Sequence, residues 1–219
     1  MGAEGGFLNY LRTANERVAY RKVFYRNSDV YRNRLGIRDR AELEQWERQL
    51  TAERAEEGFP EEANFRTYNA FKAIHRHLFQ DLYAWAGTER RYTTGRGAVP
   101  FAVPAYIART MTGLFEELAR DRYLVGRTKH GFADAAARCV NEINACHPFI
   151  DGNGRTQRFW LRMLANNAGF ELTLASRDGG RWNEASRIGF LRSDHRPMAK
   201  LIERRLKRIS SARREGIAG

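Results

Sequence analysis

The sequence predicts an all-α domain that carries one small β-hairpin. Apolar residues recur at the three- and four-residue spacing of a helix that packs one face against a core, most clearly at Phe71, Ile74, Leu78 and Leu82. One stretch, residues 86–104, instead holds three glycines and two prolines, so it cannot be helical throughout. We therefore expect amphipathic helices interrupted by a single hairpin.

The helices are expected in order along the chain. A short helix lies within residues 7–24, after a glycine-rich start. Asp39 is expected to be the N-cap of the next helix, which runs to about Ala55, because a carboxylate there accepts a hydrogen bond from the first helical turn. The remaining helices are expected over residues 65–85, 104–119, 132–146, 181–192 and 196–210, and one more begins at about residue 154.

The hairpin is expected in the middle of the glycine-rich stretch. Tyr92–Thr94 and Val99–Phe101 are its predicted strands, and they flank a turn at Gly95-Arg96-Gly97. A mobile surface loop is the alternative for this segment. The length of 219 residues suits one domain with an arm. We expect an N-terminal helical arm over residues 1–55, a core over 56–205 and a basic C-terminal tail over 206–219.

The net charge of +12 comes almost wholly from arginine, with 33 Arg against 5 Lys. The planar guanidinium group suits phosphate better than the ammonium group of lysine does. The charge therefore indicates an anionic partner, which would be a nucleic acid, a nucleotide or an acidic protein surface. A well-solvated basic surface without a partner is the alternative.

The cysteines and the apolar runs indicate the compartment. Cys139 and Cys146 are seven residues apart on one predicted helix, too far for a disulfide, so the chain suits a reducing compartment. No apolar run reaches the ~20 residues that span a membrane, and the start lacks the apolar core of a signal peptide. We expect a cytoplasmic bacterial protein, with export through a dedicated secretion machine as the alternative.

The segment HPFIDGNGRTQR, residues 147–158, combines features that bind phosphate. Gly152 and Gly154 let main-chain amides approach a ligand closely, and the loop opens into a helix whose free N–H groups attract an anion. Arg155 and Arg158 are three residues apart, so they share a helical face and can clamp the same ligand. Each feature has an ordinary structural explanation, as a turn or a solvated helix.

His147 and Asp151 add proton transfer and metal binding to this segment. A neutral imidazole beside phosphates can take a proton from an incoming hydroxyl. A carboxylate can hold Mg²⁺ that bridges phosphate oxygens. A structural loop needs the glycines but neither the histidine, the acid nor both arginines. The segment therefore predicts in-line attack of a hydroxyl group on a phosphorus atom.

These twelve residues match every defined position of the motif HPFx[DE]GNGRxxR, so the chain resembles the Fic-domain (Fic/Doc) proteins. The resemblance covers roughly residues 20–205. It implies a Fic-domain helical bundle with a β-hairpin flap. It also implies a protein adenylyltransferase, a nucleotidyltransferase that moves AMP from ATP to a Ser, Thr or Tyr hydroxyl of a target protein. Gly154 stands where a phosphorylating branch of the family has Lys, which favours AMP transfer; UMP or GMP transfer would use the same phosphate site.

The resemblance also implies roles for individual residues. His147 is the general base, Asp151 holds Mg²⁺, and Phe149 is a buried anchor. The implied phosphate-binding residues are Gly152, Asn153, Gly154, Arg155 and Arg158. The hairpin is the implied flap, which registers a target segment by strand-like pairing through Tyr92, Thr93, Thr94, Gly95 and Arg96.

Regulation and targets are further expectations from the resemblance. Many Fic proteins are inhibited by the glutamate of an [ST]xxxE[GN] helix, and this chain has one match, from Ser211 to Gly216 with Glu215 as the acid. Inhibition in trans by a small antitoxin is the alternative. The leading expectation is the toxin of a toxin–antitoxin system. The alternatives are a secreted effector that modifies host small GTPases, and a basic nucleic-acid-binding module without catalysis. Nucleic acid is not expected as the substrate.

Overall fold

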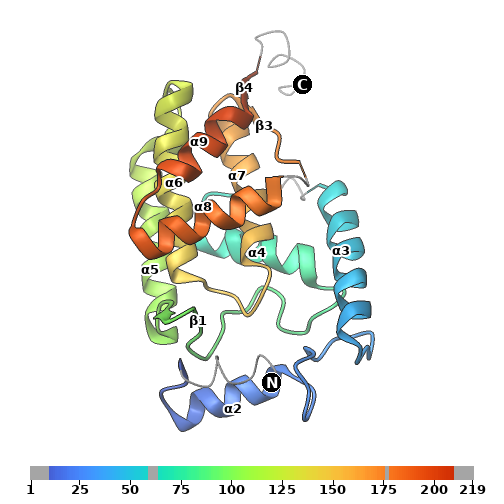
Figure 1. Ribbon diagram of the computed structural model, residues 1–219. Helices are drawn as coiled ribbons and strands as arrows, with labels where there is room; N and C mark the ends of the chain where they lie inside the picture. Colours follow the sequence, from blue (N-terminus) through green and yellow to red (C-terminus); the bar gives the residue numbers. More distant parts are fainter. Residues whose placement is uncertain (1–9, 59–63, 176–177, 210–219) are drawn as a thin grey trace.

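A computed structural model describes residues 10–58, 64–175 and 178–209, and the predicted all-α class is confirmed (Figure 1). The helices are α2 Ala14–Val23, α3 Arg40–Glu56, α4 Tyr68–Phe79, α5 Pro104–Arg120, α6 Lys129–Cys146, α7 Asn153–Asn167, α8 Gly179–Arg192 and α9 Arg196–Arg205, with a 3₁₀ turn, η2, at Arg122–Leu124. The strands are β1 Gly95–Arg96, β2 Val99–Pro100, β3 Phe170–Leu172 and β4 Leu206–Arg208.

Side-chain caps fix several of the helix starts. Asp39 caps α3 as predicted, and its carboxylate accepts a hydrogen bond from the Glu42 N–H at 2.8 Å. The helix α6 begins at Lys129, three residues before the predicted start at Phe132, because Thr128 caps it through the Gly131 N–H. Polar capping residues therefore mark these starts more accurately than the first apolar residue does.

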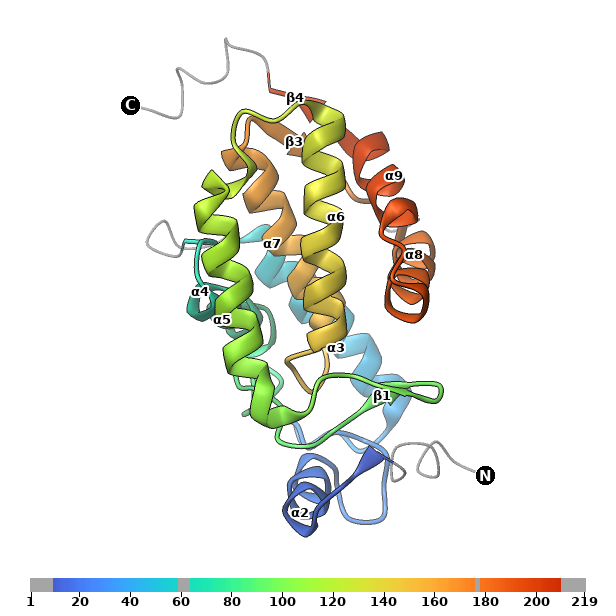
Figure 2. The ribbon, with the colours of Figure 1, turned by 90° about the vertical axis from the view of Figure 1, so that its left-hand side faces the viewer.

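The core lies among α4, α5, α6 and α7, with α8 and α9 packed on the outer side of α6 (Figures 1 and 2). Phe71 and Ile74 of α4 are fully buried, as the apolar spacing predicts. On α7, Trp160, Leu161 and Leu164 form the buried face. Within the described residues, no helix is both long and apolar enough to cross a bilayer.

A hairpin forms in the predicted segment, but the prediction of its first strand at Tyr92–Thr94 is wrong. β1 consists of Gly95–Arg96, which were predicted to lie in the turn, because the turn itself is formed by Gly97 and Ala98. Gly95 pairs with Pro100 and Arg96 with Val99, and Gly97 turns the chain with a φ of 63°. Tyr92 and Thr93 lie outside this ladder and are buried. Figure 2 shows the hairpin between the lower end of α5 and the N-terminal helix α2.

A second two-stranded sheet is absent from the predictions. β3 pairs antiparallel with β4, with Leu172 opposite Leu206. The predicted helix over residues 196–210 is therefore wrong beyond Arg205. Leu206 is buried and its backbone is extended, because it packs into the core beside β3 instead of continuing the helix.

Candidate active site

The twelve-residue segment, residues 147–158, includes the loop between α6 and α7. Both ends of this loop have left-handed backbone. His147 ends α6 with a φ of 48°, and its N–H donates to the Ile143 carbonyl at 2.9 Å. Gly152 begins α7 with a φ of 76°. Phe149 is buried between them, stacked on His75 with ring centroids 3.9 Å apart. The loop is thus fixed at both ends and anchored in its middle.

The imidazole ring of His147 is held neutral. It stacks on Phe101 with the ring centroids 4.1 Å apart and the planes 3° apart. Burial, followed by the positive charges of Arg90 and Arg96, lowers the pKa of His147 to about 3. Its Nδ1 atom is buried and has no hydrogen-bond partner among the described residues. The ring therefore has the protonation state that a general base requires at neutral pH.

Arg90, which the sequence analysis did not select, connects the catalytic loop to the flap. Its buried guanidinium group donates to the carbonyls of Cys146 (3.0 Å) and His147 (2.7 Å) at the end of α6. It also donates to the carbonyls of Tyr92 (2.7 Å) and Ala102 (2.5 Å), which lie on the two sides of the hairpin. One side chain thus sets the position of the flap relative to His147.

Asp151 lies in the same loop, and its side chain could hold a cation. Its Oδ1 accepts a hydrogen bond from the Gly152 N–H at 2.6 Å. Burial and then the nearby Glu47 carboxylate raise the pKa of Asp151, although Arg155 opposes the shift. A divalent cation would relieve this repulsion. Among residues 10–58, 64–175 and 178–209 no group of three or more His, Cys, Asp or Glu could hold a metal by itself. The site therefore fits Mg²⁺ only as an ion shared with phosphate oxygens.

The Asn153 side chain closes the loop. Its Oδ1 accepts from the Phe149 N–H and its Nδ2 donates to the Phe149 carbonyl, both at 3.0 Å. The amide is buried in this position. The phosphate contact of Asn153 stays a prediction, and its main-chain N–H, in the first turn of α7, is a donor for it.

The two glycines of the loop are not equivalent. A Cβ atom on Gly152 would come within 2.4 Å of the Phe79 ring, so this position requires glycine for its backbone and for its space. Gly154 lies inside α7 and does not have a positive φ. A Cβ atom there would lie 3.5 Å from the Arg158 guanidinium group, its nearest neighbour apart from the backbone of α7. The expectation that both glycines relax the backbone thus holds only for Gly152.

Arg155 is engaged by a residue that lies 108 positions away in the sequence. Glu47 of α3 forms a salt bridge with the Arg155 guanidinium group and accepts a hydrogen bond from the Tyr83 hydroxyl. Arg155 also lies over the Phe79 ring, 4.6 Å from its centroid. No local pattern in the sequence indicates Glu47, because it is one of several acids on a solvated helix.

Arg158 faces a cavity of about 350 Å³ beside α3 and α7. No carboxylate in the described part of the chain forms an ion pair with it, and Arg155 and Arg162 are its charged neighbours. Burial and then these two cations lower the pKa of Arg158 to about 10. Arg48 also lines the cavity. Arg158 itself has no carboxylate partner among the described residues, so the cations around it favour an anionic ligand at this position, as expected for a phosphate site.

A second cavity, of about 300 Å³, is lined by His147 and Asp151. Its remaining walls come from the flap and from the N-terminal arm, through Tyr92, Thr94, Gly95, Arg96, Phe101, Tyr20, Phe24 and Tyr31 among others. Of the predicted flap residues, only Gly95 and Arg96 are partly exposed. The candidate inhibitory residues Ser211 and Glu215 lie outside the described residues, so inhibition by Glu215 stays a prediction.

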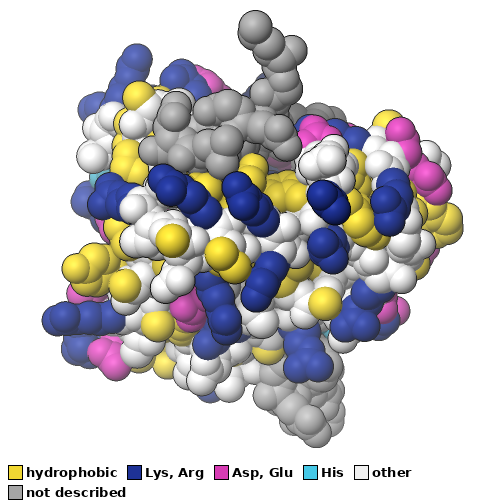
Figure 3. Space-filling view, turned by 90° about the horizontal axis from the view of Figure 1, so that it is seen from below, with side chains coloured by type: hydrophobic (Ala, Val, Ile, Leu, Met, Phe, Trp, Pro, Cys, Tyr) yellow, Lys and Arg dark blue, Asp and Glu magenta, His cyan; other side chains and the backbone are white. Residues whose placement is uncertain are grey.

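The surface around the arm is basic. Figure 3 shows Lys and Arg side chains across the face that carries α2, with few acidic side chains among them. The exposed cations of the arm include Arg12, Arg17, Arg21, Lys22 and Arg26.

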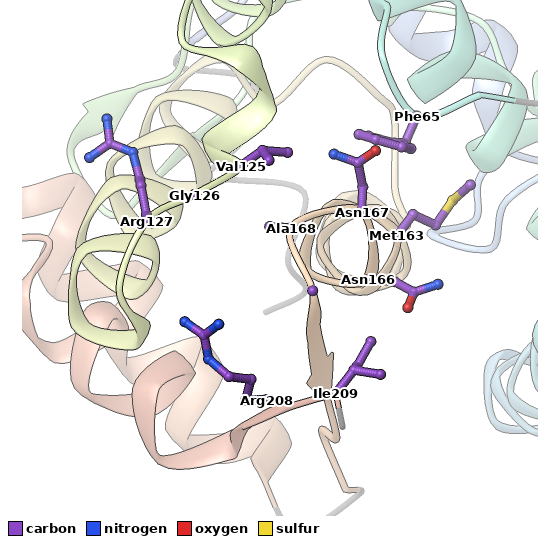
Figure 4. Close-up of a pocket in the computed structure, with 11 residues that line it drawn as sticks. Phe65, Val125, Gly126, Arg127, Met163, Asn166, Asn167, Ala168, Arg208 and Ile209 are labelled. Atoms are coloured by element: carbon purple, nitrogen blue, oxygen red, sulfur yellow. The ribbon is translucent and has the colours of Figure 1, made fainter. Parts of the chain in front are cut away.

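A further cavity, of about 760 Å³, lies at the opposite end of α7 (Figure 4). Arg127 and Arg208 lie on one side of it, and Phe65 and Met163 on the other. The described residues that line it include no acid, histidine, cysteine or hydroxyl side chain. These residues therefore offer no group for general base or nucleophilic chemistry, in contrast to the cavity at His147.

Known proteins resemble the chain in sequence and in structure. A model of the Fic/DOC family matches residues 65–165. The chain is 41% identical over 182 residues to y4lH of Sinorhizobium fredii, named a probable protein adenylyltransferase, over 82% of this chain and 93% of that protein. It is 35% identical over 173 residues to the probable protein adenylyltransferase Fic of Escherichia coli K12, over 75% of this chain and 82% of that protein.

Two solved structures have a similar fold. BepC of Bartonella tribocorum, a VirB-translocated effector with bound AMPPNP, superposes with a TM-score of 0.81 at 24% identity, over 90% of this chain and all of that chain. The N-terminal Fic domain of a Bep effector from Bartonella quintana, with bound ADP, has a TM-score of 0.78 at 28% identity, over 86% of this chain and 96% of that chain.

Proposed function

Because the chain belongs to the Fic/DOC family, we propose that it is a protein adenylyltransferase that transfers AMP from ATP to a hydroxyl side chain of a protein. One observation carries the proposal. A neutral His147 lines one cavity, while Arg155 and Arg158 of the same twelve-residue segment line another. A hydroxyl group that enters the first cavity meets the α-phosphorus of a nucleotide whose distal phosphates occupy the second.

The proposed reaction proceeds by in-line displacement. His147 accepts the proton of the acceptor hydroxyl, and the hydroxyl oxygen forms a bond to the α-phosphorus of ATP. The bond between the α-phosphorus and the bridging oxygen breaks, so pyrophosphate leaves with the bonding electron pair. The histidine then releases its proton to solvent. The imidazole is unprotonated at physiological pH, as a base must be before the transfer, and the negative charge of bound phosphates would raise its pKa toward the working range.

The other residues of the loop bind and orient the nucleotide. Arg155 and Arg158 neutralise the distal phosphates, and the first N–H groups of α7 donate to them. Asp151 would hold Mg²⁺, which supplies charge neutralisation for the leaving pyrophosphate. The geometry of Glu47 supports a positioning role, because it keeps the Arg155 guanidinium group against the Phe79 ring.

We further propose that the protein acts in the bacterial cytoplasm as a toxin whose partner is a small antitoxin. The unpaired Arg158 in the described residues supports inhibition by a carboxylate, which Glu215 would supply in cis and an antitoxin in trans. Comparing auto-labelling of the wild type and Glu215→Gly separates these two. An increase in the variant supports the cis contact, and equal labelling supports the antitoxin.

Labelled ATP tests the proposed activity. The wild type should incorporate AMP, labelled at the α-phosphate, into protein, and His147→Ala should lose this incorporation. His130→Ala is the matched control, because His130 is exposed and pairs only with Glu203. Equal labelling by the wild type and His147→Ala would refute the mechanism. Label that comes only from γ-labelled ATP would show phosphoryl transfer instead.

A further inference from the structure

The outer edge of the flap is covered by the N-terminal arm. The Thr94 carbonyl accepts from the Phe101 N–H at 2.9 Å, so Thr94 faces the second strand, while Thr93, Gly95 and Gly97 face the other way. The arm contacts the hairpin at these three residues, through main-chain groups at Thr93 and Gly97 and through packing at Gly95.

Each of the three contacts comes from a defined residue of the arm. Glu16 accepts hydrogen bonds from the Thr93 N–H (3.0 Å) and hydroxyl (2.6 Å). The Tyr10 hydroxyl donates to the Gly97 carbonyl. A Cβ atom on Gly95 would lie 2.8 Å from the Tyr10 ring, so Tyr10 packs on the hairpin at this residue. The Thr93 N–H is thus already paired with Glu16 in this arrangement, while pairing of a target strand with the flap stays a prediction.

Glu16 connects the flap to the start of α2. Its second oxygen accepts from the Arg12 N–H at 2.6 Å and the Thr13 N–H at 3.2 Å, which closes the capping box of α2. Burial by itself would raise the pKa of Glu16, but the hydrogen bonds from Thr93, Arg12 and Thr13 lower it. A buried carboxylate with four donors fixes the helix and the strand in one arrangement.

The arm also forms one wall of the cavity at His147. Tyr20 and Phe24 approach this cavity from the arm, and Tyr20 lies edge-on to Tyr92 with ring centroids 5.2 Å apart. The cavity, at about 300 Å³, has room for about ten water molecules, at the ~30 Å³ that each occupies in the liquid. This space suits a single side chain better than a paired main-chain segment.

We propose that Glu16 is a positioning residue that holds the flap to α2, so that the acceptor side chain reaches His147 through the cavity between α2 and the flap. This inference rests on the proposed adenylyl transfer. It makes the N-terminal arm part of acceptor selection, because α2 and the flap form two walls of the cavity that the acceptor side chain would enter.

Glu16→Gln tests the proposal, and Glu42→Gln is the matched control. Both glutamates are the third residue of a helix, but Glu42 is exposed and has no contact with the flap. Gln would place an NH₂ group against the N–H donors of Arg12 and Thr13, so the four-donor arrangement is lost. Thr93→Val removes one of the four donors and should have a smaller effect of the same kind.

Two acceptors are compared. The protein acceptor is the inactive His147→Ala variant of this chain. The small acceptor is water, and its reaction is measured as hydrolysis of ATP to AMP and pyrophosphate. Glu16→Gln should raise KM for the protein acceptor by about tenfold, the effect of losing one or two charge-assisted hydrogen bonds. Hydrolysis and KM for ATP should be unchanged. Hydrogen exchange at the Thr93 amide should become faster in Glu16→Gln and stay unchanged in the control Glu42→Gln.

Three outcomes would overturn the proposal. Greater labelling of the protein acceptor by Glu16→Gln would show that the arm is an inhibitory cover. An equal loss of protein labelling and of hydrolysis would show a general structural role. Unchanged kinetics would show no role. A wild type that neither labels protein nor cleaves ATP would refute the proposed function, while exchange at Thr93 would still report whether Glu16 holds the flap.

Discussion

Gly152→Ala should destabilise the protein strongly, and the structure gives the size of the effect. A Cβ atom at a φ of 76° costs about 1–2 kcal/mol in the left-handed region. The same atom would lie 2.4 Å from two atoms of the Phe79 ring. Phe79 is fully buried and stacked on His75 with ring centroids 4.7 Å apart, so it has little freedom to move away. Overpacking of this kind costs about 1–3 kcal/mol.

The net effect is a difference between these costs and a small gain. Replacing glycine lowers the entropy of the unfolded chain, which stabilises the folded state by about 0.4–1 kcal/mol. We expect Gly152→Ala to lower the free energy of unfolding by about 2–4 kcal/mol. For a protein of this length, that corresponds to a fall in melting temperature of roughly 5–15 °C.

Gly154→Ala is the control two residues away. Its Cβ atom would lie 3.5 Å from the Arg158 guanidinium group, which is an ordinary van der Waals contact. An alanine inside a helix is favoured over glycine by about 0.5–1 kcal/mol. The two variants should therefore differ in opposite directions in urea denaturation. A loss below about 1 kcal/mol for Gly152→Ala, or equal losses in both variants, would refute the reasoning from φ and from Phe79.

Three further predictions follow from buried polar groups. Glu47→Gln should lower the free energy of unfolding by about 2 kcal/mol, which is less than the loss of a fully buried ion pair because Arg155 is partly exposed. The same variant should raise KM for ATP, and a lower KM would show that Glu47 competes with phosphate. Arg90→Lys keeps the charge but loses the fork that reaches four carbonyls, so labelling of protein should fall even where the protein remains folded by circular dichroism; full activity would contradict the link between flap and loop. The pKa of buried His75 is lowered to about 3, so the unfolded state binds a proton that the folded state excludes, and stability should fall as pH falls from 6.5, by about 2 kcal/mol at pH 5; a His75→Gln variant with the same pH dependence would contradict this.

The sequence predicts this fold and this loop well where the signal is local. The apolar spacing of α4, the cap at Asp39 and the glycines around Arg96 each act within one element, so a pattern in one stretch is enough. The sheet of β3 and β4 is different, because Leu206 becomes extended only when Leu172 is available to pair with it. The basic run after Arg205 gives no indication of a strand.

The same distinction separates the parts of the candidate site. The identities of His147, Asp151 and Arg158 follow from the motif, since neighbouring positions of one loop specify them. Their partners do not follow from it. Glu47 and Glu16 reach the site from helices that lie far away in the sequence, and each is one acid among many on an otherwise solvated helix. Only the packing of those helices selects them.

The contacts of the two arginines follow from where the acids lie. Glu47 neutralises Arg155 and holds it on the Phe79 ring, so the first arginine of the motif has a fixed position before any ligand binds. Arg158 has no such partner in the described residues and keeps the repulsion of Arg155 and Arg162. Bringing an anion to Arg158 therefore relieves an existing cost, whereas an anion at Arg155 must share a cation that a carboxylate already contacts. The free energy of binding a distal phosphate should accordingly come mainly from Arg158, and Arg155 should contribute mainly to its orientation.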